Sequence, residues 1–290
     1  MQIITSNAEL CRFIPNTFAP VAGETPLYEK IEPHLRAAEQ WFDLNVIPLE
    51  ELYYTAGEDT RVPRYPQLPE DMAPFIIAAE AYRNAIDSLN LVLTANGFGI
   101  VSNDHVAPAS KERTDHLKES LLYARDEAIA RLVRLLDRDC DWSGTVGYDR
   151  FHICILPYGH RMSPSWTFDT WQDECHSYRV LEDALADKYI SRPLYQVLRS
   201  PYEKDTAWDD HDRMLLRSVH RMLSVIEPNI LKGQPQDQPL RGVVDYIRKA
   251  KEQDGETAAR VFDLWRQSPV AAMWEDHSFK NDKEKGGVWL

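Results

Sequence analysis

The sequence is poor in the residue patterns that accompany redox, metal or membrane chemistry. None of its four cysteines has CxxC spacing, which in a reducing compartment predicts buried thiols. No apolar run approaches the ~20 residues that a membrane-spanning helix needs. The first residues have neither the basic region nor the long apolar region of a signal peptide, so we expect a protein made and used in a cytosol. The cysteines are Cys11, Cys140, Cys154 and Cys175.

Positive charge is also scarce. The chain has 33 Lys and Arg residues against 46 Asp and Glu residues, a formal net charge of −13. Clustered basic side chains are what bind phosphates, so this balance argues against nucleic-acid binding by bulk electrostatics. It remains compatible with a protein that DNA passes without binding, because a like-charged wall repels the phosphate backbone.

Catalytic motifs are missing too. There is no G-x-S-x-G motif, and no cysteine has a catalytic-looking context. The segment LVLTANGFGIVSN contains G-x-G at Gly97 and Gly99, but Ser102 occupies the third glycine position of a dinucleotide fingerprint and no helix follows directly. The segment instead predicts a β-hairpin over residues 91–102, about an Asn96-Gly97 turn.

Apolar spacing over most of the chain is helical and predicts a mainly α fold: a helical bundle with a small inserted β-hairpin and an extended C-terminal tail. Residues 55–74, rich in proline, are expected to form a loop, and FHICIL (151–156) a short strand. Asp126 and Ala130 are expected on a solvated helix face. Helices are expected at 24–46 (with Pro33 inside), 75–89, 110–137 (capped by Ser110), 168–185, 190–198 (capped by Ser191), 209–226, 240–251 and 255–267.

These elements suggest four regions. We expect an N-terminal helical domain over residues 1–138, which carries the hairpin, and an irregular linker over 139–165. A C-terminal helical region would follow over 166–278, and an extended tail over 279–290.

Histidines raise the question of a metal site. His152, Cys154 and His160 lie close in sequence but lack the spacing of a structural zinc site. Asp210, His211 and His220 resemble part of an acidic metal site, although helix capping explains aspartates at a helix start. We therefore predict neither a cofactor nor a metal, and keep a metal-dependent hydrolase using Asp210, His211 and His220 as an alternative.

Two segments are candidates for contacts with other chains. A two-stranded hairpin alone is marginally stable in water, and its free edges can pair with another chain. The C-terminal end carries apolar residues in an otherwise polar strip, and Trp289 could anchor in a neighbour or fold back on its own core. The predicted contact residues are Leu91, Leu93, Asn96, Gly97, Phe98 and Ile100 in the hairpin, and Phe279, Val288, Trp289 and Leu290 in the tail.

Three segments carry a resemblance to a known family. They are the N-terminal M-x-I-I-T-S-N-A-E-L-C-R-F-I-P-N, the central LVLTANGFGIVSNDHVAPASKER and the C-terminal F-K-N-D-K-E-K-G-G-V-W-L. Together they resemble an uncharacterised family of virion structural proteins found in Bacteroidales phages and prophages. The resemblance runs the full chain, and its NGFGIVSN…APASKER part is the specific one.

The resemblance implies a non-enzymatic neck component of a phage virion, a head–tail connector or adaptor. It would form a cyclic homo-oligomer, a twelvefold ring under the portal protein, with tail or stopper proteins as further partners and DNA passing through. Such a protein would be assembled in the host bacterial cytoplasm. Within the same class, a stopper, tail-completion or capsid accessory protein is the alternative; outside it, a helical cytosolic adaptor unrelated to phage.

Overall fold

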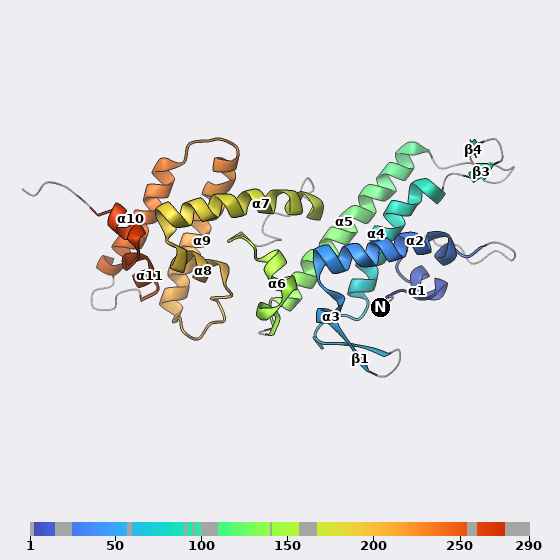
Figure 1. Ribbon diagram of the computed structural model, residues 1–290, viewed down its shortest axis with the longest axis horizontal. Coiled ribbons are helices and arrows are strands. Elements are labelled where there is room, and N and C mark those ends of the chain that lie inside the picture. The colour runs from blue at the N-terminus through green and yellow to red at the C-terminus, as the bar shows by residue number, and fades with distance from the viewer. Residues whose placement is uncertain are drawn as a thin grey trace, which may run out of the picture. The chain divides into compact units, whose positions relative to one another are not determined.

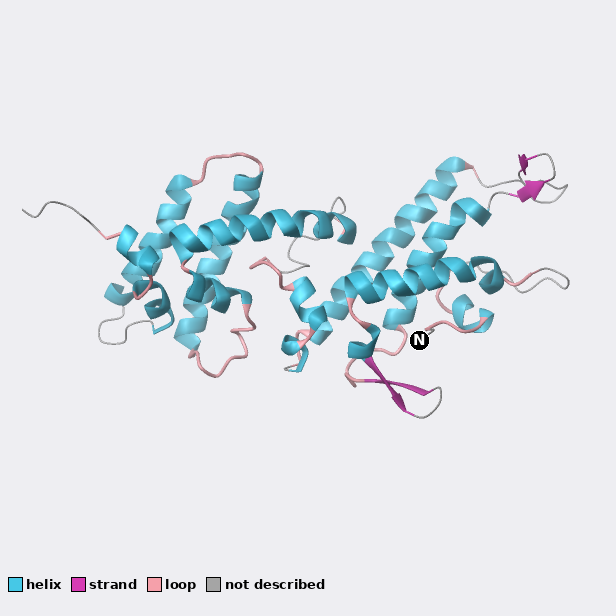
Figure 2. Ribbon diagram, viewed as in Figure 1, coloured by secondary structure: helices cyan, strands magenta, loops and turns pink. Residues whose placement is uncertain are grey.

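The computed structural model describes residues 3–14, 25–56, 60–89, 92–94, 97–99, 110–139, 141–156, 167–253 and 260–275. Within these residues the protein is mainly helical, with two pairs of short antiparallel strands (Figures 1 and 2). The predicted mainly α fold with a small β-hairpin is therefore confirmed. The predicted extended tail, 279–290, lies outside the described residues.

The chain divides into two compact units. Unit 1 comprises residues 1–153 and 157–174, and unit 2 comprises residues 154–156 and 175–290. Helix α7 (Phe168–Leu185) consequently begins in unit 1 and ends in unit 2. The first part of the predicted linker belongs to unit 1, where it forms a 3-10 turn and a short helix.

Unit 1 is built on three long helices, with α4 packed against both α2 and α5. Short elements connect them, including a π-helical turn, η1, which continues α2 directly. The elements of unit 1 before α7 are α1 (Asn7–Cys11), α2 (Leu27–Trp41), η1 (Phe42–Val46), α3 (Leu49–Leu52), β1 (Tyr53–Ala56), β2 (Thr60–Pro63), α4 (Met72–Leu89), β3 (Val92–Thr94), β4 (Gly97–Gly99), α5 (Lys111–Leu136), η2 (Asp141–Gly144) and α6 (Val146–Phe151).

The long helices of unit 1 form where the apolar spacing placed them. α2 buries Ile31 and Leu35 one turn apart, and its Pro33 lies within the helix. α4 is apolar on most sides because it lies between α2 and α5. Ser110 caps α5 by accepting a hydrogen bond from the N–H of Arg113, as predicted.

A second hairpin stands where sequence predicted only a loop. β2 pairs with β1 in an antiparallel register that runs from Tyr53–Pro63 to Ala56–Thr60. Proline is unfavourable in the interior of a helix, but it is tolerated in a strand where the missing N–H would point away from the ladder. That is the position of Pro63, so the expectation of a loop throughout 55–74 was wrong.

The predicted strand FHICIL is also absent from the structure. Phe151 ends α6, and the residues after it form bends rather than a strand. The backbone N–H of Ile155 donates to the Glu182 carboxylate at 2.8 Å instead of to a β-ladder. An apolar run signals burial, and here a side chain satisfies the buried backbone without a second strand.

Unit 2 encloses one hydrophobic core, to which α8, α9 and α10 contribute most of the buried aliphatic side chains. Ser191 caps α8 as predicted, by accepting from the N–H of Leu194. α9 runs past Pro228 to Leu231, beyond its predicted end at Ile226, and Gly233 follows with a φ of 74°. After α7, the elements are η3 (Ala186–Ile190), α8 (Arg192–Arg199), α9 (Asp210–Leu231), α10 (Asp237–Gln253), η4 (Arg260–Phe262), α11 (Asp263–Arg266) and α12 (Pro269–Met273).

Candidate interaction site

The predicted contact hairpin forms two three-residue strands. Val92 pairs with Gly99, Leu93 with Phe98 and Thr94 with Gly97. Figure 1 shows the β3–β4 hairpin beyond the C-terminal end of α4 and the N-terminal end of α5. Gly97 belongs to β4 and pairs with Thr94, so it lies in a strand and not in the turn predicted for Asn96-Gly97.

Most of the other predicted contact residues lie outside the part of the chain that the structure describes. Leu91, Asn96 and Ile100 lie outside the described residues, and so do the four residues predicted in the C-terminal tail: Phe279, Val288, Trp289 and Leu290. The structure thus brings Leu93 and Phe98 together as a backbone pair. The contact role of all these residues stays a prediction.

The hairpin β1–β2 offers short outer edges. The N–H of Arg64 donates to the carbonyl of Leu52, so the pairs Tyr53–Pro63 and Thr55–Arg61 point their backbone groups outward. Proline has no N–H, and that of Tyr53 donates to the carbonyl of Leu49. Each edge therefore offers one outward N–H, from Thr55 or Arg61, which limits the ladder that a partner strand could add.

Large apolar side chains are exposed on helices of both units. In unit 2, Met214 and Val225 of α9 are 51% and 64% exposed. They are eleven residues apart, which brings them to the same face of the helix about three turns from each other. The other exposed large apolar residues of the described chain are Leu44, Tyr54, Tyr123, Val146, Val180, Leu231 and Met273.

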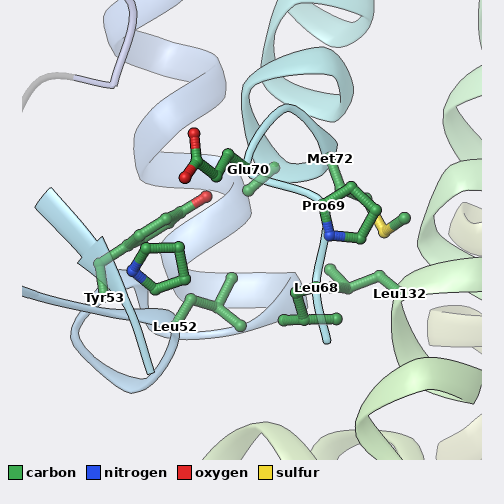
Figure 3. A pocket seen from close by; sticks show the side chains of 9 residues that line it. Leu52, Tyr53, Leu68, Pro69, Glu70, Met72 and Leu132 are labelled. Atoms are coloured by element: carbon green, nitrogen blue, oxygen red, sulfur yellow. The ribbon is translucent and has the colours of Figure 1, made fainter. Parts of the chain in front are cut away.

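A small pocket lies at the base of the β1–β2 hairpin (Figure 3). Leucine, proline and methionine side chains form most of its wall. Its interior has room for about one water molecule, far less than the several hundred Å³ of a metabolite site. This pocket is therefore no candidate for a substrate site.

A buried charged cluster in unit 1 is centred on Arg125 of α5, whose side chain is fully buried. Its guanidinium contacts Glu80 of α4 at 2.6 Å, Asp126 at 2.8 Å and Asp169 of α7 at 3.3 Å, and it lies 5.0 Å from the ring centre of Trp41 in α2. A single side chain thus connects four helices. The expectation that Asp126 is solvated was wrong, because its carboxylate is paired with Arg125 and accepts from the N–H of Phe168. Ala130 is buried as well.

The cluster shifts the pKa values of its members in different directions. Burial raises the pKa of Asp126 above its usual value, against the opposing effect of the Arg125 charge. Burial also pushes the pKa of Glu80 upward, but the hydrogen bond from Arg83 and the charge of Arg125 outweigh it and lower that pKa. Every charge here has a partner within the cluster, which is the arrangement of a structural ion-pair network.

A second buried cluster lies in unit 2. Glu182 of α7 and Glu227 of α9 are both fully buried. Glu182 accepts hydrogen bonds from the N–H of Ile155 at 2.8 Å and the hydroxyl of Tyr195 at 3.0 Å. Burial raises the pKa of Glu182 to about 7 and also raises the pKa of the Cys154 thiol.

The residues of the hydrolase alternative are not assembled into a site. Asp210 lies in the first turn of α9 and pairs with Arg213 at 2.9 Å, while Asp209 caps the helix. The ring of His220 is 6.4 Å from that of Tyr202. In the part of the chain that the structure describes, no three His, Cys, Asp or Glu side chains are placed to hold a metal ion. His160 lies outside that part.

Comparison with known proteins gives one match. Residues 19–151 match the model of a family of unknown function, DUF6712. The matched segment covers less than half of the chain, lies within unit 1 and ends with α6. It contains Glu80, Arg125 and Asp126 of the ion-pair network, but not Asp169. No curated protein and no solved structure matches the chain. Among the described helices, none is long and apolar enough to cross a membrane.

Neither buried cluster was predicted from the sequence, although the sequence contains one signal for the burial of Arg125. Arg125 lies four residues after Leu121 and four before Ile129, both buried on the same face of α5. A charged residue in the middle of an apolar stripe predicts a buried ion pair. Glu182 gave no such signal for its contact with Ile155, because 27 residues separate the two in the chain.

Proposed function

We propose that the chain is a structural component of a phage virion neck, a head–tail connector or adaptor. Copies of it would form a closed ring under the portal protein, contact tail or stopper proteins on the other side, and let DNA pass through. The protein acts by assembly rather than by catalysis. The resemblance of the three sequence segments supplies the phage context, and the described residues support the assembly role.

The β3–β4 hairpin is the main structural support for assembly into a ring. A hairpin of two three-residue strands is marginally stable alone in water, and these strands stand at the ends of two long helices (Figure 1). A ring requires two different surfaces on each copy that meet head to tail and close by rotation. A projecting hairpin that packs on the neighbouring copy supplies one of them.

The exposed apolar face of α9 offers the second surface. Met214 and Val225 leave apolar atoms in water along one helix face, where burial against a neighbour would gain about 25 cal/mol per Å². Tyr54 on the β1–β2 hairpin, 47% exposed, adds a side chain typical of protein contacts. The C-terminal residues Val288, Trp289 and Leu290 are proposed as a further anchor on a neighbour or on the portal.

The net charge suits a channel for DNA. A ring of copies that each carry −13 repels phosphates and provides no basic groove in which DNA would be retained. Passage without specific binding needs that repulsion. The same charge makes a nucleic-acid-binding role a poor alternative.

Assembly is tested with the purified full chain, alone and with the portal protein of the same phage. Native mass spectrometry and electron microscopy should find a closed ring, and the ring should bind the portal. A chain that is strictly monomeric at all concentrations, with and without portal, would refute the proposal. A ring located away from the portal in a virion map would instead make the protein a stopper, tail-completion or capsid accessory protein.

The contact residues are tested by Phe98→Lys, which places a charge in the central pair of the hairpin, and by deletion of residues 279–290. Each should abolish or weaken ring formation while circular dichroism still reports a folded helical chain. Tyr123→Lys is the matched control, since Tyr123 is 58% exposed on α5. If both changes leave assembly and portal binding at the level of the control, these segments are not contacts.

A further inference from the structure

The solvent-facing side of α9 has the residue spacing along which a second helix packs. Met214, Ser218, Arg221 and Val225 follow one another at intervals of four, three and four residues, so they share one face of the helix. Met214 and Val225 are exposed apolar side chains, and Arg221 is exposed between them. The opposite face of α9 is packed into the core of unit 2. We refer to these four residues as the α9 seam.

Unit 1 has a seam with the same spacing on α2 and its continuation η1. Pro33, Ala37, Gln40 and Leu44 also follow at intervals of four, three and four residues, and all four are exposed. Leu44 is 69% exposed, the highest value among the large apolar side chains of the described residues. The opposite face of α2 packs against α4. We refer to these four residues as the α2 seam.

Charge makes the two seams complementary. Nearly all of the net charge of −13 belongs to unit 1, because Lys and Arg residues almost balance Asp and Glu residues in unit 2. On α9, Arg217 pairs with Glu203, whereas Arg221 forms no ion pair within the described residues. The α2 seam has no charged member, and Asp43 lies at its edge. The α9 seam therefore fits the acidic unit 1 of another copy better than a second α9 seam, where positive charge would meet positive charge.

A parallel alignment matches the two seams over their whole length. Each seam spans eleven residues, about 16 Å of helix. Val225 then lies opposite Leu44, and both side chains leave water together. Arg221 lies opposite Gln40, whose amide oxygen accepts hydrogen bonds, and next to the Asp43 carboxylate.

An antiparallel alignment gives Arg221 a poorer environment. It would place Arg221 over Ala37, beside Arg36, whose guanidinium already pairs with Glu32 at 2.7 Å. The positive charge of Arg221 would then meet a second guanidinium instead of the Asp43 carboxylate. The parallel alignment is the one that joins opposite charges.

We propose that the α9 seam of one copy packs in parallel on the α2 seam of the next copy. The contact joins two different surfaces, so its repetition from copy to copy is the head-to-tail association that a ring requires. This inference rests on the proposed assembly into a ring and names the surface that receives α9.

A charge swap in the full chain tests the pairing. Arg221→Glu places a carboxylate beside Asp43, and Gln40→Arg places a second guanidinium opposite Arg221. Each change should raise the dissociation constant between copies by about tenfold or more, measured by sedimentation velocity over a concentration series. The double variant should recover most of the loss, because each contact then joins opposite charges again. Circular dichroism shows that each variant is folded.

Lys249→Glu is the matched control, because it is the same kind of charge reversal at an exposed position of α10. It should leave association at the wild-type level. A photo-crosslinking side chain in place of Val225 locates the contact in a mixture of isotopically heavy and light chains. It should join residues 33–44 of a different copy.

The outcomes separate this inference from the proposed function. Rings that form equally well in Arg221→Glu, Gln40→Arg and the control would overturn the contact and leave the ring standing. Crosslinks from position 225 only within one chain, or to α9 of another copy, would overturn it as well, and so would a double variant no better than the single ones. A wild type that stays monomeric at all concentrations, with and without the portal protein, would refute the ring and the contact together.

Discussion

Gly147, the second residue of α6, leaves little room for an added methyl group. A Cβ built there would lie 2.5 and 2.7 Å from the Cη2 and Cζ3 atoms of Trp142, and 2.9 Å from Oε2 of Glu51. Trp142 is fully buried and donates its indole N–H to Asp137. The carboxylate of Glu51 is equally constrained, because it accepts from the N–H groups of Val146 and Gly147.

Gly147→Ala should therefore destabilise unit 1. Overpacking of this kind costs about 1–3 kcal/mol. Displacing the Glu51 carboxylate adds about 1 kcal/mol per weakened hydrogen bond, and the better helix propensity of alanine returns up to about 1 kcal/mol. A net loss of about 2 kcal/mol corresponds to a melting temperature about 4–8 °C lower for a unit of this size.

The measurement is thermal and urea unfolding followed by circular dichroism and tryptophan fluorescence. Gly144→Ala is the control, since a Cβ there meets no atom within 4 Å and should leave stability within about 0.5 kcal/mol. Gly147→Ala should destabilise a Trp142→Phe protein less than it destabilises the wild type, because the smaller ring removes the clash. A Gly147→Ala protein as stable as Gly144→Ala would refute the reasoning.

Two further predictions concern one helix of each unit. Arg125→Met should lower the unfolding free energy of unit 1 by about 3–5 kcal/mol at neutral pH, because Glu80 and Asp126 keep buried charges without their partner. Urea unfolding at several pH values should find this loss shrinking in acid: the lowered pKa of Glu80 stabilises the wild type above about pH 4.5, and that stabilisation disappears as the pH falls through the folded-state pKa. An unchanged loss at low pH would contradict the pairing. Gly242→Ala, in α10 with no atom within 4 Å of the added Cβ, should stabilise unit 2 by up to about 1 kcal/mol in calorimetry, and a decrease would mean that the site is not open.

Local chemistry made much of the fold predictable. Apolar spacing identified α5 and α7 nearly to their ends, and a serine before each of α5 and α8 marked the start correctly through its cap. The β3–β4 hairpin was predicted from its Asn-Gly signal and exists, although Gly97 closes the ladder instead of forming the turn. These features depend on residues that are neighbours in the chain, so their causes can be read locally.

Errors arose where a distant partner decided the outcome. Pro63 disfavours a helix at residues 60–63, yet only pairing with β1 makes that segment a strand. The apolar run 151–156 is buried as a strand would be, but the Glu182 carboxylate takes the N–H of Ile155 and no ladder forms. A pattern in one segment reports how much of it is buried, not which group will satisfy its backbone.

The sequence by itself determined the mainly α class, most helix positions, the acidic charge and the lack of a recognisable catalytic motif. Only the tertiary structure placed Asp126 beside Arg125 in the interior and brought the N–H of Ile155 to the Glu182 carboxylate. Helical periodicity needs information from a few turns, whereas a buried charge is stable only beside a partner that folding supplies. The two clusters that tie the helices together were therefore invisible until the helices were packed.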